Sequence, residues 1–309
     1  MNPYSYTSDG TQFNLHLKGT SGRWLRYAVD FPSARPTRYE ETSTVRGEYF
    51  QPREADNAPL AILLHGVGDQ SVIPCRLLAR SLVKNGVACF IPYLVVHSSR
   101  MPEVTKRRFP LLTAEEWFEG YRISVIEVQQ VLDWAGSRAG IDKEKIAVIG
   151  ISFGGFISAI AMGVDERIGA GVFITMGGNG EKISRQSRRG SIKEGYWRTE
   201  AEYHQVQKSY AQYLIEVAEN GFENVIPVRE SFLTDPLTFA HRLRQRPVFM
   251  INALWDEAIP KQATLDFWEA CNQPDIAWLP ATHATIWLWY PLISRKIADF
   301  LSSTFNNSE

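Results

Sequence analysis

The chain lacks the features that mark secreted, metal-bound or membrane proteins. Its three cysteines, among 309 residues, lie far apart and form no C-x-x-C pair, which argues against a disulfide framework and a zinc cluster. No apolar run approaches the ~18 residues of a membrane span. The first residues show no cationic segment followed by an apolar one. These gaps predict a cytoplasmic protein without a membrane partner.

An excess of positive or negative charge is also missing. The 33 Lys and Arg residues balance 34 Asp and Glu residues, for a formal net charge of -1. Proteins that bind phosphate backbones usually present a strong positive field, so we expect no nucleic-acid partner. No H-x-x-x-H or carboxylate-histidine cluster is evident, and we expect neither a metal nor another cofactor.

What the sequence does contain is an alternation of strand-like and helical segments. This order is typical of a mostly parallel α/β sheet with helices on both faces. Helices are expected after Thr113, where Glu116 has capping-box spacing, and around Pro291 near the end of the chain. Short apolar runs predict buried strands at 60–65, 87–91, 145–149, 169–176, 248–252 and 276–279.

Two long stretches interrupt this alternation. Residues 93–112 form an irregular, partly basic connection, and 177–246 are longer than a strand-helix connection usually is. Apolar residues in 203–217 recur at helical spacing before Gly221, which predicts a largely helical cap over the carboxyl edge of the sheet. The expected organisation is an amino-terminal extension with the first strands at 1–59, a core at 60–176 and 247–309, and a helical cap insertion at 177–246.

The segment Gly150-Ile151-Ser152-Phe153-Gly154 follows a buried strand directly and matches G-x-S-x-G. A sharp strand-to-helix turn needs flanking residues without bulky side chains, and it raises the serine hydroxyl above the sheet. It also places the amide of Phe153 at a helix amino end, where it could stabilise an oxyanion. A chance glycine pattern is the plain alternative, and the strand before it and the helix after it favour Ser152 as a nucleophile.

A second glycine turn, His65-Gly66-Val67-Gly68-Asp69, ends an earlier strand. We expect the Val67 amide to be the second oxyanion donor, and Gly66 and Gly68 to let the backbone approach the substrate. An ordinary turn is the alternative, and His65 is interpreted as structural.

A serine hydroxyl needs a base, and a histidine base works best when a carboxylate fixes its tautomer. Of the histidines that follow Ser152, His204 and His241 lie in helical runs, whereas His283 lies in a loop after the last strand. It is therefore the expected base. Asp256, after the strand ending at Asn252, is the expected acid, and Asp235 is the reserve. Glu257, which follows Asp256, is expected to point elsewhere. Trp255 and Trp287 flank these positions and are expected to contact substrate.

Four motifs carry a resemblance from Leu60 to the end of the chain: HGVGD at 65–69, GISFGG at 150–155, DEAIP at 256–260, and His283. The chain resembles the α/β-hydrolase superfamily, especially dienelactone-hydrolase-like proteins and esterases related to prolyl oligopeptidases. The resemblance implies that these motifs are the oxyanion loop, nucleophile elbow, acid and base. It departs at Ala253 and Thr282, where that family often has glycine, and Ser152 stands where dienelactone hydrolases have cysteine.

The resulting hypothesis is hydrolysis of a small-molecule carboxylic ester through an acyl-enzyme on Ser152. The same triad could cut a carbon-carbon or amide bond, and a silent binding protein on this fold is the alternative of another class. The sequence leaves the substrate and the oligomeric state open. Basic residues in the cap form either a solvated loop or a site for an anionic substrate group: Lys182, Arg185, Arg188, Arg189 and Lys193.

Overall fold

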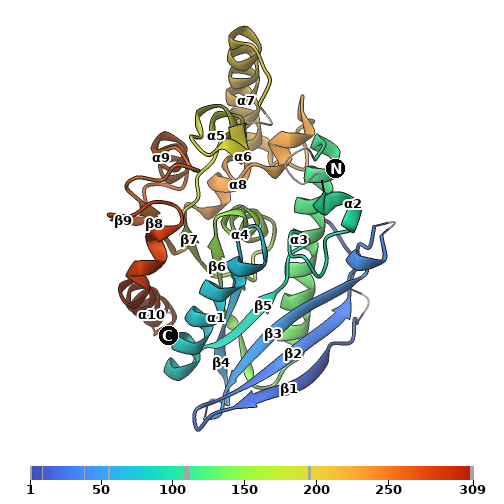
Figure 1. Ribbon diagram of the computed structural model, residues 1–309, viewed down its shortest axis with the longest axis vertical. Coiled ribbons are helices and arrows are strands. Elements are labelled where there is room, and N and C mark those ends of the chain that lie inside the picture. The colour runs from blue at the N-terminus through green and yellow to red at the C-terminus, as the bar shows by residue number, and fades with distance from the viewer. Residues whose placement is uncertain are drawn as a thin grey trace.

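A single mixed sheet runs through the molecule. The computed structural model describes residues 2–306 apart from 9, 38, 55, 108–111 and 194–195. In this part of the chain the nine-stranded sheet has the order β1-β2-β3-β5-β4-β6-β7-β8-β9 (Figure 1). The parallel strands confirm the predicted α/β class, and they are β4 (Ala58–Leu64), β5 (Ala88–Pro92), β6 (Ile141–Ile151), β7 (Ala170–Ile174), β8 (Val248–Ala253) and β9 (Asp275–Leu279).

The amino-terminal extension adds three antiparallel strands to the β5 edge of this sheet. They are β1 (Asn14–Thr20), β2 (Trp24–Pro32) and β3 (Thr44–Pro52), and β3 pairs with β5. One face of this extension buries Val29 and Phe31 in the main core, while the other carries polar residues such as Arg26 and Asp30. Strands with one solvated face are typical of antiparallel sheets.

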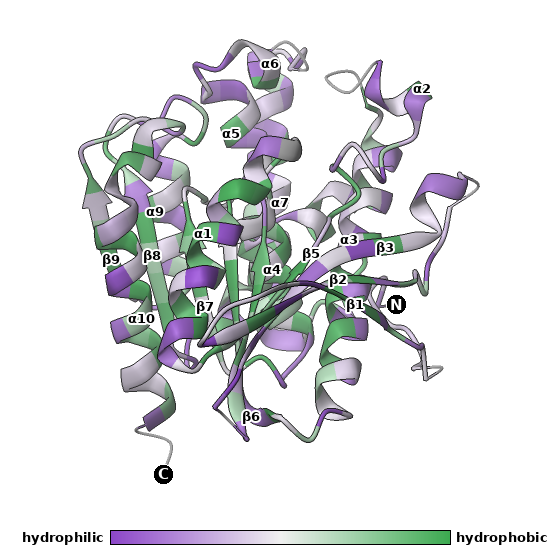
Figure 2. Ribbon diagram, turned by 60° about the horizontal axis from the view of Figure 1, so that its bottom comes forward, coloured by the Kyte–Doolittle hydropathy of each residue, from purple (hydrophilic) through white to green (hydrophobic). Residues whose placement is uncertain are grey.

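Helices cover both faces of the parallel strands. α1 (Val72–Leu82) and α10 (Tyr290–Asn306) pack on one face, and α3 (Ala114–Gly136), α4 (Phe153–Val164) and α9 (Lys261–Ala270) pack on the other. The predicted capping box of α3 is present, with Thr113 and Glu116 each bonding the other's backbone N–H. In Figure 2 hydrophobic residues gather on the central strands and hydrophilic residues on the outer faces of the helices.

The described part of 177–246, which leaves out 194–195, is largely helical, as the periodicity indicated. It contains α5 (Gly180–Gln186), α6 (Gly190–Lys193), α7 (Glu200–Asn220), η5 (Glu230–Thr234), α8 (Leu237–Ala240) and η6 (His241–Leu243). α7 buries Tyr203, Val206, Tyr210, Tyr213 and Val217 and ends at Gly221, whose φ is 79°. Figure 1 shows α5, α6 and α7 together at one end of the molecule, beyond the ends of β7 and β8. The role of 177–246 as a cap over a substrate stays a prediction.

The last part of this stretch belongs to the helix layer of the sheet. Phe239 of α8 packs so closely on α4 that a Cβ added to Gly163 would lie 2.5 Å from the Phe239 Cβ atom. α8 therefore makes the usual crossover between β7 and β8, while α5 to α7 extend beyond it.

The other connections contain α2 (Glu103–Lys106) and the 3-10 turns η1 (Glu40–Thr42), η2 (Asp69–Ser71), η3 (Val83–Asn85) and η7 (Thr285–Trp289). The expected irregular connection at 93–112 thus includes one helical turn, and 108–111 lie outside the described residues. Among the described residues, no helix is both long enough and apolar enough to cross a bilayer.

Candidate active site

Ser152 stands on a strained turn between β6 and α4. Its φ of 52° and ψ of -117° lie outside the regions that ordinary residues occupy, a distortion that costs about 1–3 kcal/mol. The turn is tight, because a Cβ at Gly154 would lie 2.1 Å from the Leu64 carbonyl oxygen and one at Gly150 2.4 Å from that of Gly154. Only glycine fits these positions, so the sequence GISFGG allows the tight turn on which the half-buried Ser152 stands.

The loop after β4 lies directly against this turn. A Cβ at Gly66 would lie 3.4 Å from the Ser152 Cβ atom, which places the Gly66 backbone beside the serine. The Ser71 hydroxyl lies 2.7 Å from the Gly66 carbonyl oxygen and also reaches that of Gly68, so its single proton, shared between the two acceptors, holds the loop in shape. Gly68 has a φ of 87°, a conformation that favours glycine.

The two expected oxyanion donors come directly after Ser152 and Gly66 in the chain. Phe153 begins α4, where backbone N–H groups lack partners within the helix. Among the described residues, neither the Phe153 amide nor the Val67 amide donates a hydrogen bond to a protein acceptor. Their role as an oxyanion hole stays a prediction that this arrangement allows.

His65 fills the structural position expected of it. Its side chain is fully buried, with Nε2 accepting a hydrogen bond from the Leu94 amide at 3.0 Å and Nδ1 lying 2.6 Å from the Gly66 carbonyl oxygen. Nδ1 therefore carries the proton, and the imidazole fastens the loop to the segment after β5.

The structure brings Ser152, His283 and Asp256 together from three different loops. His283 Nε2 lies 3.0 Å from Ser152 Oγ, and His283 Nδ1 lies 2.9 Å and 3.0 Å from the two Asp256 oxygens. The Ala258 and Ile259 amides each donate to Asp256 Oδ1 at 2.8 Å and fix the carboxylate. This is the contact order of a nucleophile, a base and an orienting acid.

Glu257 is a site residue that sequence reasoning missed. Its side chain does not point away, because Oε2 accepts a hydrogen bond from the His283 backbone N–H at 3.1 Å. Its carbonyl accepts bonds from the Arg188 amide at 2.9 Å and from Ser187 Oγ at 3.2 Å. Glu257 thus joins the histidine loop to the linker between α5 and α6. The motif DEAIP contained the residue, but sequence alone gave no direction for its side chain.

The reserve acid and the other late histidines lie in different surroundings. Asp235 is buried and accepts bonds from the amides of Asn179, Gly180 and Leu237, so it holds the start of α5 and of α8. Burial raises the pKa of Asp235, an effect that these hydrogen bonds partly oppose. His204 is exposed and pairs with Glu200, while burial lowers the pKa of half-buried His241.

The two tryptophans expected to contact substrate differ in exposure. Trp255 immediately precedes the acid and is 59% exposed, and its amide donates to the Ala281 carbonyl at 3.0 Å. Trp287 lies in η7 after the histidine and packs partly against the core on the α10 side. Substrate contact by Trp255, Trp287, Gly66 or Gly68 stays a prediction.

The basic residues between 182 and 193 separate into two groups. Lys182 forms an ion pair with Asp266, and Arg185 pairs with Glu200 and stacks on Tyr203. Arg188, Arg189 and Lys193 are exposed. Arg188 lines a recess of about 230 Å³, with Gln186, Ala253, Leu254, Asp256, Glu257, Pro260 and Lys261.

A mostly parallel sheet, a serine on a strained strand-to-helix turn and a late histidine within reach of it define an α/β hydrolase. The chain belongs to the family described as alpha/beta hydrolase domain containing 18, whose model matches residues 28–216. The superfamily resemblance is thereby confirmed. No protein with a curated description matches the sequence.

Solved structures with the same fold include several described as esterases. The acetyl xylan esterase from Paenibacillus sp. R4 has a TM-score of 0.67 at 17% identity and covers 95% of this chain and 88% of its own. Acetyl xylan esterase 1 from Thermoanaerobacterium sp. JW/SL YS485 has a TM-score of 0.60 at 13% identity, covering 94% and 88%. A cold-adapted esterase from an Arctic intertidal metagenomic library has a TM-score of 0.58 at 16% identity, covering 91% and 96%. At these identities the likeness concerns the fold.

Proposed function

We propose that the protein is a serine carboxylesterase that acts on small-molecule esters through an acyl-enzyme on Ser152. The observation that carries the proposal is the continuous contact from Ser152 Oγ to His283 Nε2 at 3.0 Å and from His283 Nδ1 to Asp256 at 2.9 Å. The strained turn beneath Ser152 adds to it, because such strain persists where surrounding structure and function require it.

In the proposed reaction Ser152 Oγ attacks the ester carbonyl carbon while His283 Nε2 takes the hydroxyl proton. The carbonyl oxygen becomes an oxyanion, to which the Val67 and Phe153 amides would donate. His283 then gives the proton to the leaving alcohol, and the ester becomes an acyl group on Ser152. Water, deprotonated by His283, attacks the acyl-enzyme, the bond between the acyl carbon and Ser152 Oγ breaks, and His283 returns the proton to Ser152 Oγ as the acid is released. Asp256 keeps Nδ1 protonated and stabilises the imidazolium throughout.

Family membership and geometry support a hydrolase, and the esterases among the proteins of like fold favour an ester over an amide or carbon-carbon bond. The intact contacts around Ser152 weigh against a silent binding protein. The three cysteines are free and buried, which suits the expected cytoplasmic location. No cofactor takes part in the proposed reaction.

The test pairs a chemical probe with a substrate series. A fluorophosphonate should label the wild type, and turnover of p-nitrophenyl esters of increasing acyl length should exceed turnover of matched aryl amides. Ser152→Ala should abolish labelling, and both Ser152→Ala and His283→Ala should lower kcat by at least about 10⁴-fold, because members of a triad act as a unit.

His204→Ala is the matched control, since His204 is exposed and lies on α7. It should keep both labelling and turnover. Near-native ester turnover by Ser152→Ala, or equal loss in the His204 control, would refute the proposal. Faster turnover of the amides would redirect it to amide cleavage.

A further inference from the structure

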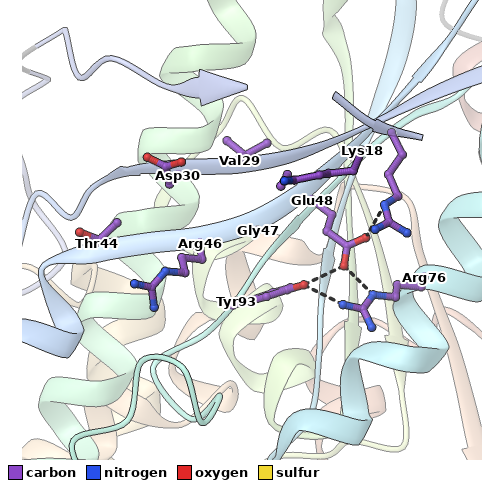
Figure 3. Close-up of a pocket in the computed structure, with 11 residues that line it drawn as sticks. Lys18, Val29, Asp30, Thr44, Arg46, Gly47, Glu48, Arg76 and Tyr93 are labelled. Atoms are coloured by element: carbon purple, nitrogen blue, oxygen red, sulfur yellow. Dashed lines mark hydrogen bonds and ion pairs between the residues drawn. The ribbon is translucent and has the colours of Figure 1, made fainter. Parts of the chain in front are cut away.

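A recess of about 520 Å³ lies on the solvated face of the antiparallel extension, opposite α1 (Figure 3). Its walls come from β1, β2, β3, α1 and the residue after β5. They belong neither to the Ser152 turn nor to the loops of Val67, Asp256 and His283. The recess is therefore separate from the candidate active site, and an inference about it does not depend on the proposed esterase activity.

The floor of the recess is a buried carboxylate shared by two arginines. Glu48 is 3% exposed, and its carboxylate accepts a hydrogen bond from Arg76 Nε of α1 and lies 3.5 Å from Arg26 Nε of β2. Tyr93 completes the group, because its hydroxyl donates to Glu48 Oε1 at 2.7 Å and accepts from Arg76 Nη2 at 2.8 Å. Burial raises the pKa of Tyr93 to about 12, so the hydroxyl keeps the proton that it donates.

This arrangement hydrogen-bonds the Arg76 guanidinium and places that of Arg26 beside the same negative charge. Long side chains usually lose conformational freedom when they bind a ligand. Glu48 reduces that loss for Arg26 and Arg76, and it leaves a surplus positive charge facing the recess. Arginine held in this way suits phosphate and carboxylate groups, which its planar fork can bind with two hydrogen bonds.

Further cations line the rim. Lys18 of β1 and Arg46 of β3 are exposed and border the recess, and Arg46 also donates to the Ser99 carbonyl at 2.9 Å. The other acid in the lining, Asp30, already accepts from Asn14 and lies 3.1 Å from His16 Nε2. Among the described residues that line the recess, the cations Lys18, Arg26, Arg46 and Arg76 outnumber the acids Asp30 and Glu48. The lining is therefore net positive in a chain whose total charge is -1.

We propose that this recess binds a small polyanion that carries phosphate or carboxylate groups. The ligand would contact the outer N–H groups of Arg26 and Arg76, with Lys18 and Arg46 closing over it. A recess of this volume accepts a molecule of metabolite size.

The experiment is calorimetric titration of the full chain at near-physiological salt, with pyrophosphate and with citrate as probes. The two probes distinguish phosphate from carboxylate chemistry. We expect at least one to saturate the wild type with a Kd of about 1 mM or tighter. The variant Lys18→Ala with Arg46→Ala leaves the Glu48 cluster intact and should raise that Kd at least about tenfold.

The charge-matched control is Arg295→Ala with Lys296→Ala, two exposed cations on α10. The control should keep the wild-type Kd, and both double variants should hydrolyse a neutral ester as the wild type does. Binding of both probes weaker than about 1 mM, an unchanged Kd in the Lys18 and Arg46 variant, or an equal loss in the control would overturn the proposal. Absence of ester turnover in the wild type would count against the esterase and not against this site.

Discussion

Two aspartates follow Ser152 at places where an acid could lie, and their hydrogen-bond partners differ. The Asp256 carboxylate contacts the His283 ring, whereas the buried Asp235 carboxylate accepts hydrogen bonds from backbone amides at the start of two helices and from the Tyr210 hydroxyl. We predict that Asp256→Asn lowers kcat by about 10⁴-fold, because an amide favours the wrong tautomer of the histidine. Asp235→Asn should leave kcat within about threefold, because Asp235 does not bind the His283 ring.

The measurement for this pair is ester turnover together with thermal unfolding. Asp235→Asn should lower Tm. Its new NH₂ group would face a backbone N–H whose hydrogen bond the carboxylate now accepts, and two donors cannot bond each other. A larger loss of kcat from Asp235→Asn than from Asp256→Asn would make Asp235 the acid.

Glu257 provides a second prediction at the scale of single residues. Glu257→Ala removes the acceptor of the His283 backbone N–H, so the imidazole should lose its fixed position. We expect kcat to fall about ten- to a hundredfold with little change in KM, because small displacements of a catalytic group are costly. Glu257→Gln keeps an acceptor oxygen and should recover most of the activity.

The matched control for Glu257 is Glu269→Ala, an exposed glutamate on α9. The readouts are kcat, KM and Tm. A general loss of stability would lower Tm, but it would leave kcat and KM of the folded enzyme unchanged. Wild-type kcat in Glu257→Ala would show that the bond to His283 does not position the base.

At the scale of elements, the segment of α5 and α6 touches the loop of the acid through Arg188. The recess there sets Arg188 and Lys261 against Asp256 and Glu257, so its charges balance. We therefore predict that Arg188→Ala with Arg189→Ala changes kcat/KM equally, within about threefold, for a neutral ester and for its carboxylate-bearing analogue.

The comparison needs both substrates in the wild type, in this variant and in Arg295→Ala with Lys296→Ala as a control of equal charge. An advantage of the anionic ester that the wild type has and the Arg188 and Arg189 variant loses would contradict the prediction. It would instead assign these arginines to an anionic group of the substrate.

The elements that sequence predicted well are those with strong local signals. The capping box of Thr113 and Glu116 and the apolar stripe of α7 each fix one helix. The strands β1 to β3 do alternate, as Val29 and Phe31 do with Asp30 in β2, but this pattern does not tell which strand each of them pairs with. Their positions depend on pairing with β5, which is remote in sequence.

The same distinction applies to the site. Chain order and strand ends sufficed to select Ser152, Asp256 and His283, since the carboxyl ends of parallel strands meet at one edge. The direction of the Glu257 side chain depends on the path of two loops that meet only in the folded chain. The residues of the Glu48 cluster come from β2, β3, α1 and the position after β5, so no single stretch of sequence predicts it.

At the scale of the whole molecule, one buried ion pair joins the extension to the core. Arg100 and Glu127 are 0% and 1% exposed and form two hydrogen bonds of 2.6 Å. Arg100 also donates to the carbonyls of Tyr93 at 2.9 Å and Thr42 at 3.1 Å, and Ser33 donates to Glu127 at 2.7 Å. The pair thereby ties α3, the segment after β5 and the link between β2 and β3.

We predict that Glu127→Gln lowers the free energy of unfolding by about 3–5 kcal/mol, because it leaves the Arg100 charge buried without a counter-ion. Arg100→Met with Glu127→Leu should cost less than the sum of the single changes, since no charge then stays buried. Denaturant unfolding measures both.

Arg295→Gln, in an exposed pair with Asp299, is the control and should change stability by less than about 0.5 kcal/mol. If Glu127→Gln were as mild as that control, solvent would reach Arg100 and the extension would not depend on this pair. If the double change cost the full sum, the hydrogen bonds to Tyr93, Thr42 and Ser33 would carry the stability, and the charges would contribute little.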